Sequence, residues 1–285
     1  MVSEQLKKLL EFSIINIDKP QGPTSFSVSD YVRKQFREFG VRKTSHFGTL
    51  DPKVTGVLPI ALNRACKLTG FFLGHDKTYI GVMHINSDVE IKELQDIINK
   101  KFLGKIKQLP PRKSRVKRQE REREIIEFTI LEKQEKDFLF ETQVQGGTYI
   151  RKLCSDLGEN EELGGAHMLE LRRIQAGIFP ENISTDLYKF QEAVEKAKKG
   201  DEEDLIKILT PAEQSIKKIM PHLQVKEQEV KKLLTGKPIF LSVLENPDKL
   251  PKEGKFALFY KEKFIEIAHI SLEGEIIARP EFVFN

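Results

Sequence analysis

The sequence contains only two cysteines, Cys66 and Cys154, and no tryptophan among its 285 residues. The cysteines lie far apart, outside the Cys-x-x-Cys and Cys/His spacings that bind zinc, so we expect neither a disulfide framework nor a metal site. No apolar run approaches the roughly 20 residues that a membrane-spanning helix requires. The N-terminus also lacks the basic start and apolar run of a secretory signal. These absences predict a soluble, cytoplasmic protein with no membrane partner.

The length of 285 residues predicts two domains. Residues 1–220 mix strand-like and helix-like segments without a regular β-α-β alternation. This predicts an α+β domain around a mixed, largely antiparallel sheet. From Pro221 the pattern changes, and short β-rich runs separated by glycines predict a small β-barrel-like module over residues 221–285.

Apolar periodicity predicts the individual elements of the first domain. The predicted strands are residues 13–17, 57–62, 78–85, 125–131 and 138–145. The predicted helices are residues 25–39, 64–73, 149–157 and 166–173, followed by a charged helical pattern over 185–219.

One loop, residues 46–59, reads H-F-G-T-L-D-P-K-V-T-G-V-L-P and carries a single carboxylate, Asp51. Gly48 and Gly56 allow backbone angles and close approaches that other residues resist, and Pro52 restricts the conformation of Asp51. The pattern therefore predicts a carboxylate held in one position. An ordinary Asp-Pro turn is the alternative.

The formal net charge of +4 is unevenly distributed. Between residues 105 and 123, nine basic residues face two acidic ones, and Pro110 and Pro111 favour an extended arm. A second basic set lies between residues 33 and 43. Both sets indicate a polyanion such as RNA, although a solvated charged face is the alternative. The candidate RNA-binding residues are Lys113, Arg115, Lys117, Arg118, Arg121 and Arg123.

Several motifs occur in a specific order along the chain. They are D-K-P-Q-G-P-T-S at 18–25, the loop at 46–59, K-T-Y at 77–79, Q-L-P-P at 108–111, G-T-Y-I-R at 147–151 and the glycine-bounded segment 164–177. Together they resemble the TruB and dyskerin family of pseudouridine synthases, and most closely the archaeal dyskerin-type enzyme that works with H/ACA guide RNA. The stretch from residue 221 resembles a PUA domain.

The resemblance implies a reaction that breaks the glycosidic bond of uridine, turns the uracil and rejoins it through carbon, with no cofactor and no metal. Asp51 matches the catalytic aspartate, which acts as nucleophile or base. A buried carboxylate needs a cation within reach to stay charged, and Arg151 matches that cation. A buried pair would make Arg151→Ala costly to stability as well as turnover. A surface helix arginine is the alternative.

The substrate uracil must leave its stack to reach such a site. Tyr79 matches the tyrosine that stacks on the base, and Tyr149 and Leu171 match residues that line the same pocket. His46 matches a histidine that helps to hold the flipped nucleotide. Tyr149 and Leu171 could equally be plain core residues. For Tyr79 the motif context favours stacking over the alternative core role, and an ordinary loop histidine is the alternative for His46.

The sequence also departs from the family pattern at three positions. Ser45 precedes His46 where glycine is usual, and Phe47 stands where a smaller residue is common. These two changes put the local backbone in question. Arg115 replaces a small residue and adds charge beside the expected RNA path.

The family resemblance also bears on assembly. Standalone TruB enzymes carry an RNA-gripping insertion after the tyrosine strand, whereas residues 85–89 here lead directly into a helix. The resemblance to the guide-dependent branch implies an H/ACA guide RNA, a substrate RNA, a small zinc-ribbon-related protein, a β-barrel protein and a kink-turn-binding ribosomal-type protein. The PUA-like module would hold the ACA end of the guide.

Three hypotheses follow. The first is a guide-dependent synthase that modifies ribosomal RNA. The second is a standalone synthase that modifies the T-loop of transfer RNA. The third is a noncatalytic RNA scaffold, in which Asp51→Ala would leave binding and function unchanged.

Overall fold

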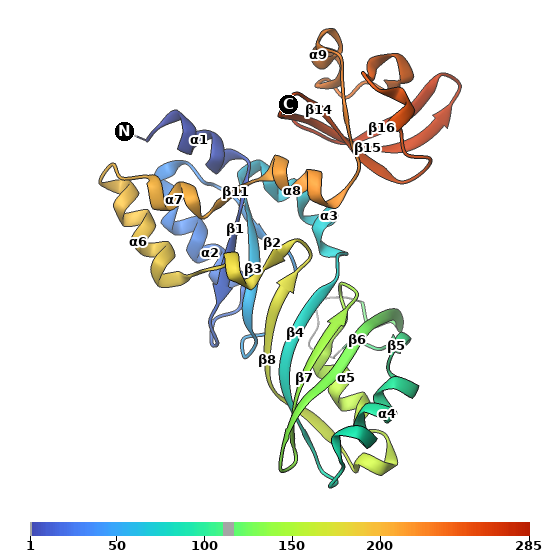
Figure 1. Ribbon diagram of the computed structural model, residues 1–285. Helices are drawn as coiled ribbons and strands as arrows, with labels where there is room; N and C mark the ends of the chain where they lie inside the picture. Colours follow the sequence, from blue (N-terminus) through green and yellow to red (C-terminus); the bar gives the residue numbers. More distant parts are fainter. Residues whose placement is uncertain (1, 111–116) are drawn as a thin grey trace. The chain divides into compact units, whose positions relative to one another are not determined.

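The computed structural model describes residues 2–110 and 117–285. The chain divides into two compact units, Met1–Leu209 and Thr210–Asn285. The division falls eleven residues before the expected boundary at residue 220, because helix α8 (Ala212–Ile219) belongs to the second unit. The two units are described separately below (Figure 1).

The first unit is built on one mixed sheet, whose central order is β10-β1-β3-β8-β4-β7-β6-β5 in the described residues (Figure 1). Only the β1–β10 and β3–β8 pairs are parallel among the registered pairs, so the predicted mixed, largely antiparallel sheet is confirmed. The strands are β1 (Ser13–Lys19), β2 (Thr44–His46), β3 (Thr55–Leu62), β4 (Lys77–Ile85), β5 (Gly104–Gln108), β6 (Arg121–Gln134), β7 (Asp137–Val144), β8 (Ala166–Ala176), β9 (Phe179–Pro180), β10 (Thr185–Asp186) and β11 (Leu209–Pro211).

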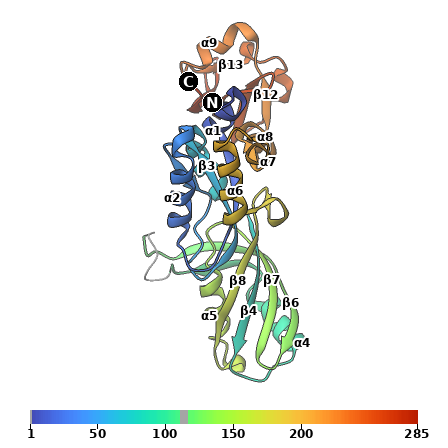
Figure 2. The same cartoon turned by 90° about the vertical axis from the view of Figure 1, so that its left-hand side faces the viewer.

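Helices cover this sheet in two groups. Helices α2 and α6 lie beside the β1–β3 part, whereas α4 packs on β6 and α5 packs on β8 (Figures 1 and 2). A single apolar core joins both parts. The α-helices of the unit are α1 (Glu4–Glu11), α2 (Ser25–Gln35), α3 (Thr69–Leu73), α4 (Ile91–Lys101), α5 (Ile150–Leu157), α6 (Leu187–Lys198) and α7 (Glu203–Lys207), and short 3₁₀ helices include η1 (Arg37–Phe39), η2 (Asn63–Leu68) and η4 (Glu181–Ile183).

Local sequence explains where helix α2 begins. The Thr24 hydroxyl accepts a hydrogen bond from the Ser27 amide at 3.0 Å, which satisfies one free amide of the first turn. The inward face then carries Ser25, Val28, Ser29 and Val32, spaced three or four residues apart. The α-helix ends at Gln35, and the 3₁₀ helix η1 completes the predicted helical segment.

The prediction of a helix over residues 166–173 is wrong, because this segment is the first part of strand β8. β8 pairs with β4 along its length, but its register shifts twice, opposite Thr78/Tyr79 and opposite Val82/Met83. Each shift interrupts the strict alternation of buried and exposed residues. The resulting apolar spacing imitates a helical period.

The parallel pair β3–β8 joins the two parts of the sheet, with Thr55 opposite Arg172 and Gly56 opposite Arg173. Gly56 has a φ of +100°, and a Cβ atom there would lie 2.2 Å from the Arg173 carbonyl oxygen. Glycine is therefore required at this position for both conformation and space.

The second unit contains a curled five-stranded sheet in the order β12-β14-β15-β16-β13 (Figure 1). Its own core shares no residue with that of the first unit. Glu266 on β15 is fully buried, and neither carboxylate oxygen has a hydrogen-bond partner among the described residues. The elements are α8, β12 (His222–Gln224), α9 (Val230–Leu233), β13 (Ile239–Phe240), β14 (Lys255–Tyr260), β15 (Lys263–Glu273) and β16 (Ile276–Val283).

Within the described residues, no helix is long and apolar enough to span a membrane. The same residues contain no cluster of three histidine, cysteine or acidic side chains that could hold a metal ion.

Candidate active site

Hydrogen bonds hold the Asp51 loop on both sides of Asp51. The partners are Ser25, the first residue of α2, and Gly22, in the turn before it. The buried Ser25 hydroxyl donates to the Leu50 carbonyl oxygen at 2.8 Å and accepts from the Leu50 amide at 2.7 Å. The Gly22 amide donates to the Pro52 carbonyl oxygen at 2.8 Å. The predicted fixed position of this carboxylate therefore has a physical cause in hydrogen bonds to its two neighbours.

A buried lysine supports the loop from below. Lys19, at the end of β1, is fully buried, and its Nζ donates to the carbonyl oxygens of Pro20 (2.8 Å), Pro52 (3.3 Å) and Val54 (2.8 Å). Burial lowers the pKa of Lys19, and the negative charge of Asp51 opposes that shift. Lys19 thus ties the loop to β1 and adds a positive charge near Asp51.

The structure brings Asp51 and Arg151 together. The Arg151 Nη2 lies 3.0 Å from the Asp51 Oδ2, and Arg151 comes from the first turn of α5. The pair is not buried as predicted: the Arg151 and Asp51 side chains are 57% and 47% exposed. Asp51 stands on a loop and Arg151 on the first turn of a helix, so water reaches both. The expected large stability cost of losing Arg151 therefore does not apply.

Two further buried cations lie under Gly48, three residues before Asp51. The guanidinium of Arg173 donates from Nε to the Val57 carbonyl oxygen at 2.8 Å and from Nη2 to the Gly48 carbonyl oxygen at 3.0 Å. A Cβ atom on Gly48 would lie 3.2 Å from the Arg173 Nη1 and 3.6 Å from the Lys77 Cε. Burial, followed by the charge of Arg173, lowers the pKa of Lys77 to about 8.

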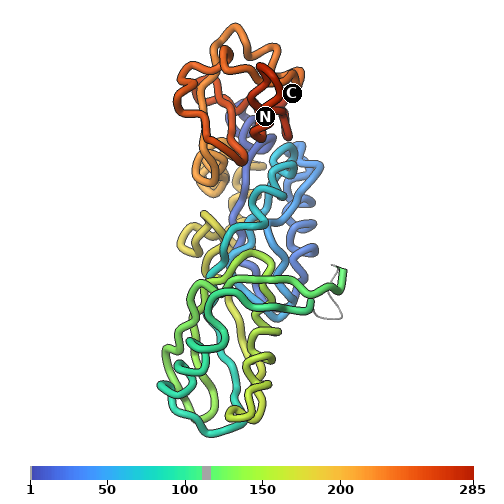
Figure 3. The backbone as a smooth tube through the Cα atoms, turned by 90° about the vertical axis from the view of Figure 1, so that its right-hand side faces the viewer, coloured from blue at the N-terminus to red at the C-terminus, as the bar shows by residue number. Residues whose placement is uncertain are grey.

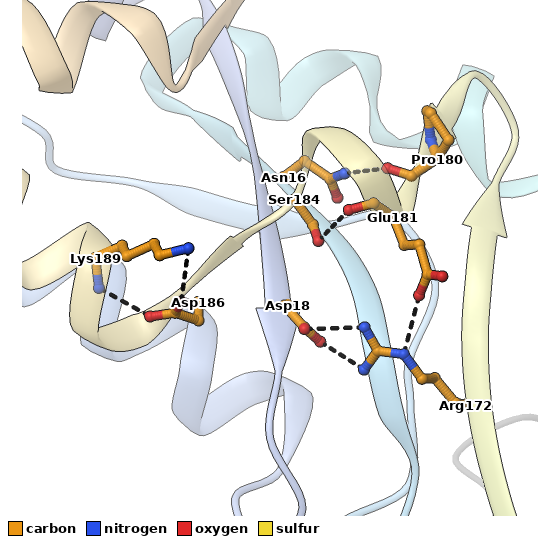
Figure 4. Close-up of polar contacts among 8 residues, drawn as sticks. All are labelled: Asn16, Asp18, Arg172, Pro180, Glu181, Ser184, Asp186 and Lys189. Carbon is orange, nitrogen blue, oxygen red and sulfur yellow. Dashed lines mark hydrogen bonds and ion pairs between the residues drawn. The ribbon is translucent and has the colours of Figure 1, made fainter.

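Arg172, next to Arg173, forms ion pairs with residues of two other elements (Figure 4). Its Nη1 and Nη2 donate to the two carboxylate oxygens of Asp18, both at 2.9 Å, and its Nε donates to Glu181 at 3.0 Å. Because β3 lies between β1 and β8, this bidentate contact spans a strand. Arg172 thereby holds β1, β8 and η4 together.

His46 begins the loop at the end of β2, and its Nε2 lies 3.1 Å from the Thr49 hydroxyl. Burial, followed by the positive charge of Arg173, lowers the pKa of His46, which favours the neutral ring. The unusual residue Phe47 is buried and stacks on Phe72, with ring centroids 4.6 Å apart. Its larger side chain is therefore accommodated in the core.

Tyr79 and Leu171 are buried on the adjacent strands β4 and β8 and belong to the same core cluster. Tyr79 lies opposite Arg173 in the register, which connects it to the cations below Gly48. Tyr149 precedes α5, and its backbone exchanges two hydrogen bonds with the buried Gln108 side chain, at 3.0 and 3.2 Å. The positions of these three residues fit both a pocket lining and a core role.

The basic residues between positions 105 and 123 lie on, or between, the antiparallel strands β5 and β6, which we call the basic hairpin. Strands β5 and β6 pair from Gly104–Ile125 to Gln108–Arg121 and run side by side at the edge of the sheet (Figure 3). Lys117 and Arg118 are exposed, and Arg121 and Arg123 are half-buried on β6. Lys113 and Arg115 lie outside the described residues. The structure thus places four of the six predicted RNA-binding residues on or directly before β6.

Arg123 lies beside the turn that leads to Arg151. A Cβ atom on Gly147 would lie 3.2 Å from the Arg123 Nη2, and the buried Arg123 Nε has no hydrogen-bond partner among the described residues. This contact connects the basic hairpin to the Asp51–Arg151 site.

Sequence reasoning assigned no role to Lys19, Lys77 or Arg173. All three are buried cations inside the motifs noted above, and basic residues are rarely buried unless their charge is used. For Lys77, its place next to the start of a predicted strand could have indicated a buried cation. Nothing in the sequence indicated which carbonyl groups these cations contact.

Comparison with known proteins gives the family. Residues 36–150 match the TruB family pseudouridylate synthase (N terminal domain), and residues 151–217 match the tRNA pseudouridylate synthase B C-terminal domain. A Methanocaldococcus jannaschii protein named "Probable tRNA pseudouridine synthase B" is 40% identical over 283 residues, which cover 99% of this chain and 79% of the relative. The chain belongs to the TruB family of pseudouridine synthases.

A Methanopyrus kandleri protein of the same name is 43% identical over 225 residues. That match covers 78% of this chain and 64% of the relative, so the chain spans less than two thirds of this relative's length.

The chain also resembles solved structures over nearly its whole length. The chain is 30% identical, with a TM-score of 0.87, to a chain in "Crystal Structure of a Cbf5-Nop10-Gar1 Complex", and the match covers 99% of this chain and 88% of that one. It is 28% identical, with a TM-score of 0.85, to a chain in "Structure of H/ACA RNP bound to a substrate RNA containing 2'-deoxyuridine", covering 98% and 87%. The predicted fold class is confirmed, and the curled C-terminal sheet fits a PUA-like module.

Proposed function

We propose that this protein is an RNA pseudouridine synthase in which Asp51 is the catalytic aspartate. The observation that carries the proposal is the Asp51–Arg151 contact of 3.0 Å, open to solvent, on a loop whose carbonyl groups accept hydrogen bonds from two buried cations, Lys19 and Arg173. In the reaction, the N1–C1′ bond of uridine breaks, a C5–C1′ bond forms, C5 loses a proton and N1 gains one. The Asp51 carboxylate can act as nucleophile or base in these steps.

The substrate pocket is part of the same proposal. Tyr79 offers an aromatic face for the extruded uracil, while Leu171 and Tyr149 line the adjoining surface. His46, kept neutral by its surroundings, holds the nucleotide through hydrogen bonds and transfers no proton. The RNA strand follows the basic hairpin through Lys113, Arg115, Lys117, Arg118, Arg121 and Arg123.

We further propose guide-dependent modification of ribosomal RNA, within a complex that includes an H/ACA guide RNA and the three predicted protein partners. The matched structures support this branch, because they are of Cbf5 with Nop10 and Gar1 and of an H/ACA RNP with a substrate RNA. The names of the curated relatives, which specify tRNA, favour a second candidate, a pseudouridine synthase that modifies transfer RNA. For this candidate we propose that no guide is needed. The division into a catalytic domain and an RNA-binding PUA-like domain, and the cytoplasmic location, belong to the proposal as well.

The test compares wild type with Asp51→Asn on two RNAs, a T-arm hairpin and a target strand supplied with guide RNA and partners. Pseudouridine is mapped by chemical adducts that resist alkaline removal. Guide-dependent formation that Asp51→Asn abolishes, with RNA binding retained, supports the main proposal. Equal modification of the bare hairpin selects the second candidate. Unchanged pseudouridine formation by Asp51→Asn would contradict both.

A further inference from the structure

Helix α2 presents one large apolar side chain to solvent beside the Asp51 loop. Phe26 is 67% exposed, although the inward face of the same helix is well formed by Ser25, Val28, Ser29 and Val32. Burying a phenylalanine contributes roughly 1.5 to 3 kcal/mol in a fold. This fold leaves that contribution unused at residue 26, so the core gives no reason for a phenylalanine there.

The position of Phe26 is fixed relative to the site. The neighbouring residue, Ser25, makes the two hydrogen bonds of 2.7 and 2.8 Å to Leu50, which directly precedes Asp51. The first turn of α2 is therefore bound to the loop, and the backbone of Phe26 keeps its place relative to Asp51. The ring itself is exposed and can turn to meet a base.

Helix α2 and the Asp51 loop both carry cations. Lys53 is exposed two residues after Asp51. Farther along α2, Arg33 and Lys34 both pair with Asp30, at 2.6 and 2.9 Å. Two cations and one acid leave a net charge of +1 on these three side chains. Aromatic faces between cations bind single-stranded nucleic acid, because bases stack on the ring while phosphates meet the cations.

We propose that Phe26 is a nucleobase-stacking residue that receives a base next to the uridine being modified. The inference rests on the function proposed above. It assigns Phe26 a place in RNA positioning and no part in the chemistry, since the target uracil itself is assigned to Tyr79. A flanking base held at Phe26 would fix the strand on the α2 side of Asp51 while the target base is extruded.

Kinetics test this assignment through KM and kcat. Phe26→Ala is expected to raise KM for the modified RNA by roughly 5- to 150-fold, the usual range for loss of one base stack. The kcat should stay close to that of wild type, and Phe26→Tyr should restore binding. The matched control is Tyr188→Ala, because Tyr188 is 87% exposed on α6 of the same unit and should leave both constants unchanged. An unchanged KM in Phe26→Ala overturns the proposal.

Fluorescence provides a second readout, because the chain has no tryptophan. In Phe26→Trp, the single indole is expected to be quenched on titration with the T-arm hairpin or the guide–target RNA, whichever wild type binds, whereas Tyr188→Trp is not quenched. If wild type forms no pseudouridine but Phe26→Trp is still quenched, the proposed function fails and the RNA contact stands. If RNA binds without quenching, or only a protein partner changes the emission, the assignment to RNA is wrong.

Discussion

At the scale of single residues, the two cations near Asp51 differ in their exposure to water. The contact with Arg151 is open to solvent, whereas Lys19 is buried beneath the loop. A charge pair in water contributes little to folding, but the same guanidinium can orient a carboxylate for reaction. Stability and activity should therefore respond differently to the loss of Arg151.

We expect Arg151→Ala to lower the free energy of unfolding by less than about 1 kcal/mol and turnover by about 100-fold or more. Chemical denaturation and single-turnover rates measure the two effects. Lys207→Ala is the control, since Lys207 forms a similarly exposed pair with Glu203 at 2.6 Å and should change stability alone. A stability loss of several kcal/mol in Arg151→Ala would show that the pair acts as a buried one.

Glu266 gives a prediction for pH. Burial raises its pKa to about 8 from an ordinary 4.5, so the folded state keeps a proton that the unfolded state releases. The free energy of unfolding should therefore fall as pH rises from about 4.5 to 8 and then level off.

Glu266→Gln removes this titration and should stabilise the protein at pH 8 by on the order of a few kcal/mol, with little change at pH 4.5. Denaturation curves across that pH range provide the measurement. Parallel curves for the two proteins would show that Glu266 has a partner or contacts water.

At the scale of elements, strand β3 depends on a glycine. Gly56→Ala would place a methyl group 2.2 Å from the Arg173 carbonyl oxygen at a φ of +100°. We expect a loss of about 3 kcal/mol or more in unfolding free energy, from combined strain and clash. Gly40→Ala isolates the strain, because φ is +92° there and the space is open. It should cost only about 1 to 2 kcal/mol, and equal losses in the two variants would exclude the clash.

The connection between β5 and β6 carries a prediction about RNA. Alanine at Lys117 and Arg118 should weaken RNA binding and reduce the slope of log affinity against log salt by roughly 0.7 to 0.9 for each phosphate that the two cations neutralise in wild type. Filter binding at several salt concentrations gives the slope. The control pair is Lys7→Ala with Lys8→Ala, two exposed lysines on α1. A slope that both double variants reduce equally would indicate a general charge effect.

The sequence allowed most elements of the first unit to be predicted, because apolar period and turn residues act locally. It failed at residues 166–173, where a register shift between Met168 and Glu170 of β8 interrupts the alternation expected of a strand. The Asp51–Arg151 contact could be predicted from motif order, but its exposure could not, since exposure depends on how α5 and the loop meet. The carbonyl partners of Lys19 and Arg173 depend on tertiary structure in the same way.

At the scale of the whole molecule, the described residues of each unit form a core cluster, and these two clusters share no residue. Leu58→Ala and Leu258→Ala form a matched pair, since both leucines are fully buried, one in each core. Each should cost about 2 to 5 kcal/mol. Calorimetry should show two transitions, of which each variant lowers one. A single transition that both variants shift equally would show that the units unfold together.

The β3–β8 pairing also bears on how the molecule is made. Residues 55 and 56 pair with residues 172 and 173, which are synthesised more than a hundred positions later. Contacts so distant in sequence form slowly and late. While the polypeptide leaves the ribosome, the segment with Asp51 therefore emerges long before the arginine that will support it. We expect a nascent chain to remain inactive until β8 has been synthesised, so catalytic competence comes as one of the last events of its folding.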